Sequence, residues 1–227
     1  MAELENRTAT EQTFAARIAR LNSRQRHELE QLLGWPPNPA NVPASFWVQV
    51  ENDMKSELAI ILLLIFSASA AQHGLGGPAI STFGDGFAIA RANEVGADFA
   101  ANTRDRLDSL STRWEEQIRT GTLNRGQVQT DLVDVLGPST AERIATTETT
   151  VATSAGGEAA AHQNGGIQQT DTWYTEKDGR VCPLCAPLHK AGRDEWMAQF
   201  PSGPPAHPRC RCWIEYAFEK ELAGNTT

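Results

Sequence analysis

The sequence has no cysteine before Cys182, few aromatic residues and no excess of basic residues. Only 7% of its 227 residues are aromatic, and 28 acidic residues against 20 basic ones give a net charge of −8. A protein that coats nucleic acid normally carries a basic surface, so this balance argues against that class while leaving room for a local basic patch. The absence of cysteine from most of the chain excludes a fold held together throughout by disulfides.

The N-terminus also lacks the positive and apolar segments of a signal peptide. We therefore expect residence in a reducing cytoplasm, which favours thiolates bound to metal over disulfides. One uncharged apolar run, residues 58–71, is shorter than the roughly 20 residues that a membrane-spanning helix needs. We expect it to form a buried core helix rather than a partner-binding or membrane segment, without stable membrane insertion.

The first two-thirds of the sequence has helical periodicity, with apolar residues recurring every three or four positions. This pattern predicts helices over 8–33, 45–71, 87–119 and 128–136, and a further helix that starts near residue 139. Between the second and third helices, five glycines and one proline in residues 73–86 predict a loop or hinge.

The character of the sequence changes after Gly166. Residues 167–175 are rich in Thr, Gln, Trp and Tyr and predict a strand, and Asp178-Gly179 is typical of a hairpin turn. Arg180-Val181 would then begin the return strand. The remaining residues are rich in proline and poor in core-forming side chains. This segment therefore needs a staple, meaning a crosslink such as a bound metal ion or a disulfide.

We therefore predict an α+β fold that is mostly α. Residues 1–137 form a helical, bundle-like N-terminal region. Residues 138–227 form a C-terminal domain, with a small β-hairpin and a loop-rich module stapled by Cys and His residues.

Five potential metal ligands cluster near the end of the sequence: Cys182, Cys185, His207, Cys210 and Cys212. Structural zinc is held by four Cys or His ligands in a tetrahedron, commonly from two short clusters joined by a loop. The two-residue spacer of the first pair lets both sulfurs face one ion. Five donors compete for four places, and we favour Cys210 with either His207 or Cys212 as the second pair. The pattern predicts a structural zinc site.

Other interpretations of the cysteines remain open: two disulfides, or free and partly buried thiols. His189 is a weaker sixth ligand candidate. A redox dithiol is disfavoured because no thioredoxin-like βαβ pattern surrounds the Cys-x-x-Cys pair. The sequence has neither the His-x-Glu of zinc deaminases nor a His-Glu-x-x-His motif, so we expect no enzyme activity.

Three segments carry a family resemblance. They are Arg-Ile-Ala-Thr-Thr-Glu at 143–148, Trp-Tyr-Thr-Glu-Lys-Asp-Gly-Arg-Val-Cys-Pro-Leu-Cys at 173–185, and His-Pro-Arg-Cys-Arg-Cys at 207–212. In order and spacing, the region from about 139 to 214 resembles the phage head morphogenesis family, which includes Mu F-like and SPP1 minor head protein-like sequences. This is about a third of the chain, and the N-terminal helical region has no motif that we can assign.

The resemblance implies a minor capsid protein of a tailed bacteriophage. Such a protein would associate with the portal protein and other capsid proteins, and would aid procapsid assembly or DNA ejection. It would lie in the virion, in the capsid interior or at the portal vertex, after assembly in the host cytoplasm. The helical region, 1–137, would dock on the portal or capsid. Some relatives are thought to contact DNA, so a zinc module that binds packaged phage DNA is the alternative function.

Four further residues are candidates for supporting roles near the ligands. We expect Trp173 to pack over the metal loops and Asp178 to form the turn before Gly179. Asp178 is alternatively a partner of Arg180, and Glu148 is a candidate anchor for Arg180 or the closing loop. Arginines 180, 193, 209 and 211 form either a basic face for phosphates or an ordinary solvated surface.

Overall fold

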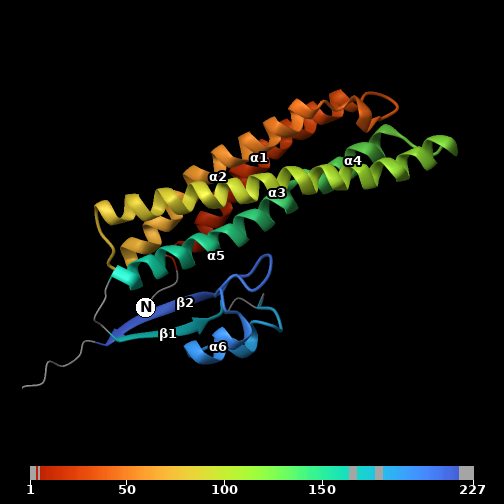
Figure 1. Ribbon diagram of the computed structural model, residues 1–227. Coiled ribbons are helices and arrows are strands. Elements are labelled where there is room, and N and C mark those ends of the chain that lie inside the picture. The colour runs from red at the N-terminus through yellow and green to blue at the C-terminus, as the bar shows by residue number, and fades with distance from the viewer. Residues whose placement is uncertain (1–3, 5, 164–167, 177–180, 220–227) are drawn as a thin grey trace, which may run out of the picture. The chain divides into compact units, whose positions relative to one another are not determined.

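The computed structural model describes residues 4, 6–163, 168–176 and 181–219. Within them the helices are α1 (Arg7–Leu33), α2 (Ala44–Gln72), α3 (Pro78–Arg119), α4 (Arg125–Val135), α5 (Pro138–Gln163) and α6 (Arg193–Gln199), with 3-10 turns at Pro39–Asn41 and Ala186–Leu188. The strands are β1 (Gln168–Tyr174) and β2 (Trp213–Glu219). The predicted fold class, α+β and mostly α, is confirmed (Figure 1).

The chain divides into two compact units, each built from several stretches of sequence. The Cys/His unit comprises residues 1–11, 61–88 and 146–227, and the helical unit comprises residues 12–60 and 89–145. These units group residues by spatial contact. The division at 137/138, which concerns the arrangement along the sequence, stays a prediction.

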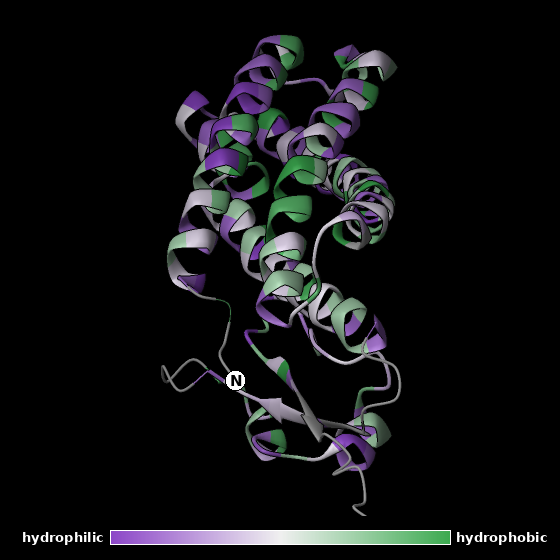
Figure 2. Ribbon diagram, turned by 90° about the vertical axis from the view of Figure 1, so that its left-hand side faces the viewer, coloured by the Kyte–Doolittle hydropathy of each residue, from purple (hydrophilic) through white to green (hydrophobic). Residues whose placement is uncertain are grey.

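Amphipathic helices build the helical unit, and Figure 2 shows apolar and polar residues on different sides of individual turns. Its α1 segment buries Phe14, Ile18, Leu21 and Leu29, which lie three to eight positions apart as one helix face requires. Gly34, with a φ of 70°, ends α1 in the left-handed conformation that glycine adopts at little cost.

A buried carboxylate links α3 to α4 in the helical unit. The indole N–H of Trp114 donates to Asp131 Oδ2 at 2.7 Å, and Gln127 Nε2 donates to Asp131 Oδ1 at 2.8 Å. Arg113 forms an ion pair with the same carboxylate at 2.5 Å. The charge of Asp131 is therefore compensated by donors on its own helix and on α3.

Helix α2 contains the apolar run that we expected to be buried. By length and composition it passes the test for a membrane span, with 44% of its most apolar window buried. Leu58, Leu62 and Ile65 are buried, whereas the side chains of Ile60 and Leu64 are 54% and 63% exposed. The run thus contributes to the core along one face and leaves an apolar face outside it.

The predicted loop over 73–86 is wrong in its second half, because α3 begins at Pro78 and only residues 73–77 connect it to α2. Proline suits the first turn of a helix, where its missing N–H has no intrahelical partner to lose. Gly84 lies inside α3 for a packing reason, since a Cβ there would be 2.9 Å from Leu63 Cδ1. Glycine permits close helix packing here instead of breaking the helix.

The predicted strand is confirmed as β1, but its partner differs from the prediction. β1 pairs in antiparallel fashion with β2, with Trp173 opposite Ile214 and Gln168 opposite Glu219 (Figure 1). Val181 lies in irregular structure, so no return strand begins there. The predicted turn at Asp178-Gly179 lies outside the described residues.

A small apolar cluster fills the C-terminal part of the Cys/His unit. Its buried members are Ala161, Trp173, Cys185, Leu188, Ala191, Trp196, Cys210, Cys212, Ile214 and Tyr216. Trp173 is fully buried, with ring centroids 6.1 Å from Trp196 and 5.8 Å from Phe200. Three cysteines therefore belong to the core itself, and their chemistry bears directly on its stability.

Candidate metal centre

The first two potential ligands lie on one tight turn. Cys185 N–H donates to the Cys182 carbonyl oxygen at 3.1 Å and lies 3.4 Å from Cys182 Sγ. A backbone N–H directed at a cysteine sulfur stabilises its thiolate form, which is the form that binds metal. Cys185 is buried, whereas Cys182 is half-buried.

The other three potential ligands follow the loop that contains α6. The N–H of Cys210 donates to the carbonyl oxygen of His207 at 3.1 Å, which closes a second turn. His207 Nδ1 lies 2.8 Å from the carbonyl oxygen of Pro208. Because a carbonyl only accepts, Nδ1 carries the proton of a neutral imidazole, and Nε2 keeps its lone pair for a ligand.

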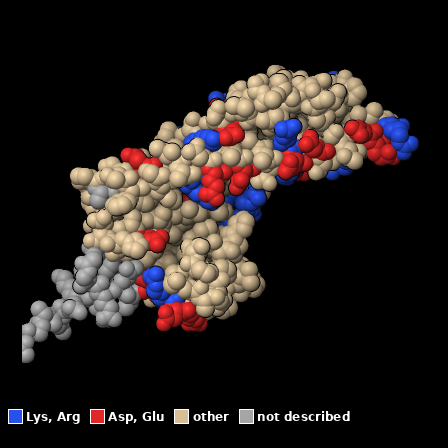
Figure 3. Space-filling model, in the orientation of Figure 1, with Lys and Arg blue, Asp and Glu red and all other residues tan. Residues whose placement is uncertain are grey.

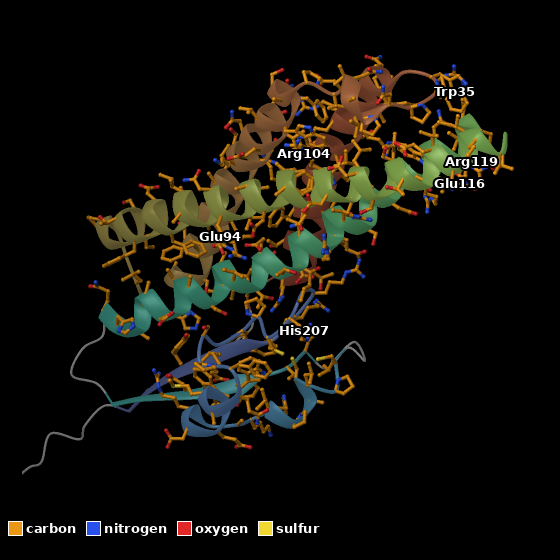
Figure 4. All side chains as sticks on the ribbon, turned by 45° about the vertical axis from the view of Figure 1, so that its right-hand side comes forward. Trp35, Glu94, Arg104, Glu116, Arg119 and His207 are labelled. Carbon is orange, nitrogen blue, oxygen red and sulfur yellow. The ribbon has the colours of Figure 1, made fainter. Side chains whose placement is uncertain are left out.

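The five donors gather at one place in two groups that share Cys185. Cys182, Cys185 and His207 form one group, and Cys185, Cys210 and Cys212 form the other, with ligand atoms within 4.8 Å of one another in each. Figure 4 shows His207 beside the sulfur-containing side chains of this region. All four cysteines are free, so the disulfide interpretation does not describe this structure.

The distances between donors agree with those around one tetrahedral ion. Zinc–sulfur bonds of about 2.3 Å and zinc–nitrogen bonds of about 2.0 Å place two sulfurs about 3.8 Å apart, and a sulfur and a nitrogen about 3.5 Å apart. Cys185 Sγ lies 3.9 Å from Cys210 Sγ and 3.3 Å from His207 Nε2. The 2.9 Å between Cys182 Sγ and His207 Nε2 is shorter and corresponds to a hydrogen bond that the Cys182 thiol donates to Nε2, a contact that a bound ion would replace. The residues present thus fit a metal ion of this kind.

Contacts among the buried thiols favour a thiolate at Cys210. Hydrogen bonds with Cys185 and then Cys212 lower the pKa of Cys210, and the contact with Cys210 raises the pKa of Cys185. At His207, burial by itself lowers the pKa, but the bond to the Pro208 carbonyl and the negative charge at Cys210 raise it overall. A cation would therefore find negative charge and unshared electron pairs within the same buried cluster.

Of the other predicted residues, Trp173 and Glu148 lie in the buried interior of the Cys/His unit. Trp173 is part of the core around the cysteines, and Glu148 is buried on α5. Asp178 and Arg180 lie outside the described residues. His189 belongs to neither group of donors, and its Nδ1 lies 3.0 Å from Thr175 Oγ1.

Of the three arginines of the proposed basic face that the structure describes, two form ion pairs with carboxylates. Arg193 forms an ion pair with Asp171, and Arg211 forms one with Glu11 at 3.3 Å. Arg209 is exposed and its backbone N–H donates to Thr147 Oγ1 at 2.9 Å. This arrangement resembles an internally neutralised module more than a phosphate-binding surface.

Threonines on α5 that sequence reasoning missed hold the second turn. Thr147 accepts the N–H of Arg209, and the hydroxyl of Thr150 donates to the carbonyl oxygen of Cys210 at 2.5 Å. The run Thr-Thr-Glu-Thr-Thr at 146–150 could have indicated this role. Threonine has a low helix propensity, so four threonines in a helix suggest that some of their hydroxyls form hydrogen bonds outside it.

Comparison with known proteins gives one match. No curated protein and no solved structure matches the chain. The sequence model of phage Mu protein F-like proteins matches residues 99–215, which is more than half of the chain and includes all five potential ligands. The chain therefore belongs to the phage Mu protein F-like family of phage head morphogenesis proteins.

Proposed function

We propose that this protein is a minor capsid protein of a tailed phage that associates with the portal vertex and aids procapsid assembly or DNA ejection. Membership of the phage Mu protein F-like family carries this proposal. It supports other capsid or portal proteins as partners and the virion as the location.

We further propose that the Cys/His cluster holds a structural zinc ion. The supporting observation is the place of the cluster, since Cys185, Cys210 and Cys212 belong to a small core that also contains Trp173 and Trp196. A bound ion would supply a crosslink between the two turns, and the free energy of metal binding would add to that of folding. Cys185, shared by both groups of donors, is the ligand on which such a site most depends.

Helix α2 exposes apolar side chains that could bind a protein partner. Ile60 and Leu64 lie one helical turn apart and are 54% and 63% exposed. Apolar side chains exposed side by side on a helix are typical of protein–protein contacts. We propose that this pair contributes to docking on the portal or a neighbouring capsid protein.

The alternative, a zinc module that binds packaged DNA, has less support. Among its candidate arginines in the described part of the chain, Arg193 and Arg211 are paired with carboxylates. On the face shown in Figure 3, basic and acidic residues are interleaved and do not form one basic patch. Nothing in the arrangement of donors favours a catalytic role, and we propose none.

The test combines metal analysis with portal binding. The full chain is co-expressed with its portal protein, and zinc content and co-purification are measured for the wild type, Cys185→Ser and Ile60→Asp/Leu64→Asp. We expect about one zinc ion per wild-type chain, lost in Cys185→Ser. The Asp variant should keep its zinc and lose the portal. Wild-type protein that purifies without metal would remove the zinc proposal, and failure to bind portal protein would remove the docking proposal.

A further inference from the structure

Arg7 and Glu11 meet Arg211 in the Cys/His unit, although Arg211 lies about 200 residues later in the sequence. Arg7 Nε donates to Glu11 Oε1 at 2.9 Å, and Arg211 Nε lies 3.3 Å from Glu11 Oε2. The side chain of Arg7 is 1% exposed, and those of Glu11 and Arg211 are 12% and 11% exposed. Glu11 thus uses each carboxylate oxygen for a different arginine.

These three charged side chains are shielded from water, so the loss of one of them would affect stability strongly. A surface ion pair contributes little to stability, but removing one partner of a buried pair leaves an uncompensated charge in a poorly solvated place. Arg7 is also near the start of α1, where its N–H donates to the carbonyl oxygen of Leu4, a residue that is itself buried. The first turn of α1 is therefore anchored in the unit by both apolar and charged contacts.

The same arginine contacts the backbone of the ligand segment 210–212. Arg7 Nη1 donates to the carbonyl oxygen of Arg211 at 3.4 Å. Arg7 Nη2 donates to the hydroxyl of Thr150, which in turn donates to the carbonyl oxygen of Cys210. Two successive carbonyl groups of the ligand segment are thus held by a chain of hydrogen bonds that begins at Arg7.

Arg211 lies between two potential ligands in the sequence, so the direction of its side chain bears on the directions of the Cys210 and Cys212 side chains. Residues 210–212 lead directly into β2, and where a backbone is extended, alternate side chains point to opposite sides. Holding Arg211 toward Glu11 is then expected to direct Cys210 and Cys212 to the other side. Both cysteines are buried in the core and belong to one group of donors. The contact between Arg211 and Glu11 therefore orients two sulfurs without touching either of them.

We propose that Leu4 and residues 6–11, at the start of α1, complete the metal centre, with Arg7 and Glu11 as positioning residues for Cys210 and Cys212. This inference rests on the proposed zinc site. Groups that orient metal ligands typically contribute 10- to 100-fold to metal affinity. Because coupling between two binding events is reciprocal, metal binding also holds the start of α1 against the unit.

The first experiment measures the zinc affinity of the full chain by competition with a chromophoric chelator. Glu11→Gln removes the charge that pairs with Arg7 and Arg211, and we expect it to weaken zinc binding about 10- to 100-fold. Glu11→Asp keeps the charge and should recover part of the affinity. Glu57→Gln is the matched control, since Glu57 also pairs with an arginine, Arg17, at 2.7 Å in the helical unit. It should bind zinc as the wild type does.

A second experiment uses the wild-type chain and needs no variant to fold. Trypsin cleaves after arginine, and the buried Arg7 should resist it when zinc is bound. Removing zinc with a chelator should accelerate cleavage after Arg7 at least about tenfold, in line with the expected coupling. The exposed Arg20 and Arg24 serve as internal references.

The outcomes separate the inference from the proposal beneath it. Wild-type protein that binds no zinc would refute both. Wild-type protein that binds zinc, with Glu11→Gln binding equally well, would refute only the role of Arg7 and Glu11. Unchanged cleavage after Arg7 on removal of zinc would also contradict that role.

Discussion

Thr149 and Thr150 are adjacent threonines on α5, both fully buried, and they differ in hydrogen bonding. The hydroxyl of Thr150 accepts from Arg7 and donates to the carbonyl oxygen of Cys210. Among the described residues, the hydroxyl of Thr149 has no hydrogen-bond partner. Replacing each by valine makes the same chemical change at two neighbouring sites with opposite expected results.

The magnitude follows from the groups left behind. Thr150→Val removes a hydrogen bond from a charged donor, worth about 1.5–3 kcal/mol, and leaves the buried carbonyl of Cys210 without that donor, which costs about 1–3 kcal/mol. Since these contributions overlap, we expect the free energy of unfolding to fall by about 2–4 kcal/mol. Thr149→Val removes an unsatisfied buried hydroxyl, so we expect no loss and a gain of up to about 1 kcal/mol.

Urea denaturation followed by far-ultraviolet circular dichroism and tryptophan fluorescence measures both variants. Because the chain divides into two compact units, two-state behaviour is tested first by comparing the transitions seen by the two probes. Hydrogen exchange of the α5 amides then reports stability locally. Equal losses in both variants would refute the assignment of the Arg7–Thr150–Cys210 chain of hydrogen bonds as a stabilising contact.

Three further predictions concern other contacts. Cys185→Ser should lower zinc content and thermal stability more than Cys182→Ser, because Cys185 belongs to both groups of donors; equal effects would contradict this. Gly156→Ala should destabilise the chain by about 2 kcal/mol or more, since its Cβ would lie 2.5 Å from the Phe66 carbonyl oxygen, which is backbone. Gly157→Ala would meet side-chain atoms of Tyr216 and His73 instead, and should cost less in thermal denaturation. At Asp131, burial by itself raises the pKa, but hydrogen bonds from Trp114, Arg113 and Gln127 lower it overall. Its charged form therefore stabilises the fold above the unfolded pKa of about 3.9, and this contribution is lost as the pH falls through the lower folded pKa. Unfolding measured from pH 5 to pH 2 should consequently show a weaker pH dependence in Asp131→Asn, and an unchanged profile would refute the argument.

Local spacing made the ligand cluster predictable from the sequence. Cys182 and Cys185 are brought together by one turn, and His207 and Cys210 by another, so their pairing needs no long-range information. The same holds for the end of α1 at Gly34, where a single glycine takes up a left-handed conformation. In these cases the residue type at a position determines the local structure.

Long-range pairing could not be predicted in the same way. β1 has the composition of a strand, and the Asp178-Gly179 dipeptide that follows it predicts a partner strand next to it in the sequence. The actual partner, β2, lies about 40 residues later. The glycine content of residues 73–86 predicts a loop that includes Gly84, whereas its actual role depends on contact with Leu63 of another helix. Nothing in residues 4–11 indicates that they meet Arg211. Each of these features depends on contacts between distant segments, which periodicity and spacing do not encode.

The pairing of β1 with β2 also sets an order of events during translation. A ribosome adds about 5–20 residues per second, so Tyr174 waits roughly 2–8 s before its partner Trp213 has been made. In that interval the first cysteine pair exists without the second, and Arg7 has waited several times longer for Arg211. The nascent chain therefore carries an incomplete thiol cluster, and Arg7 lacks its contact with the Arg211 carbonyl, until translation has passed residue 219. Early termination between the two strands would release a chain that can neither close its sheet nor assemble its ligand set.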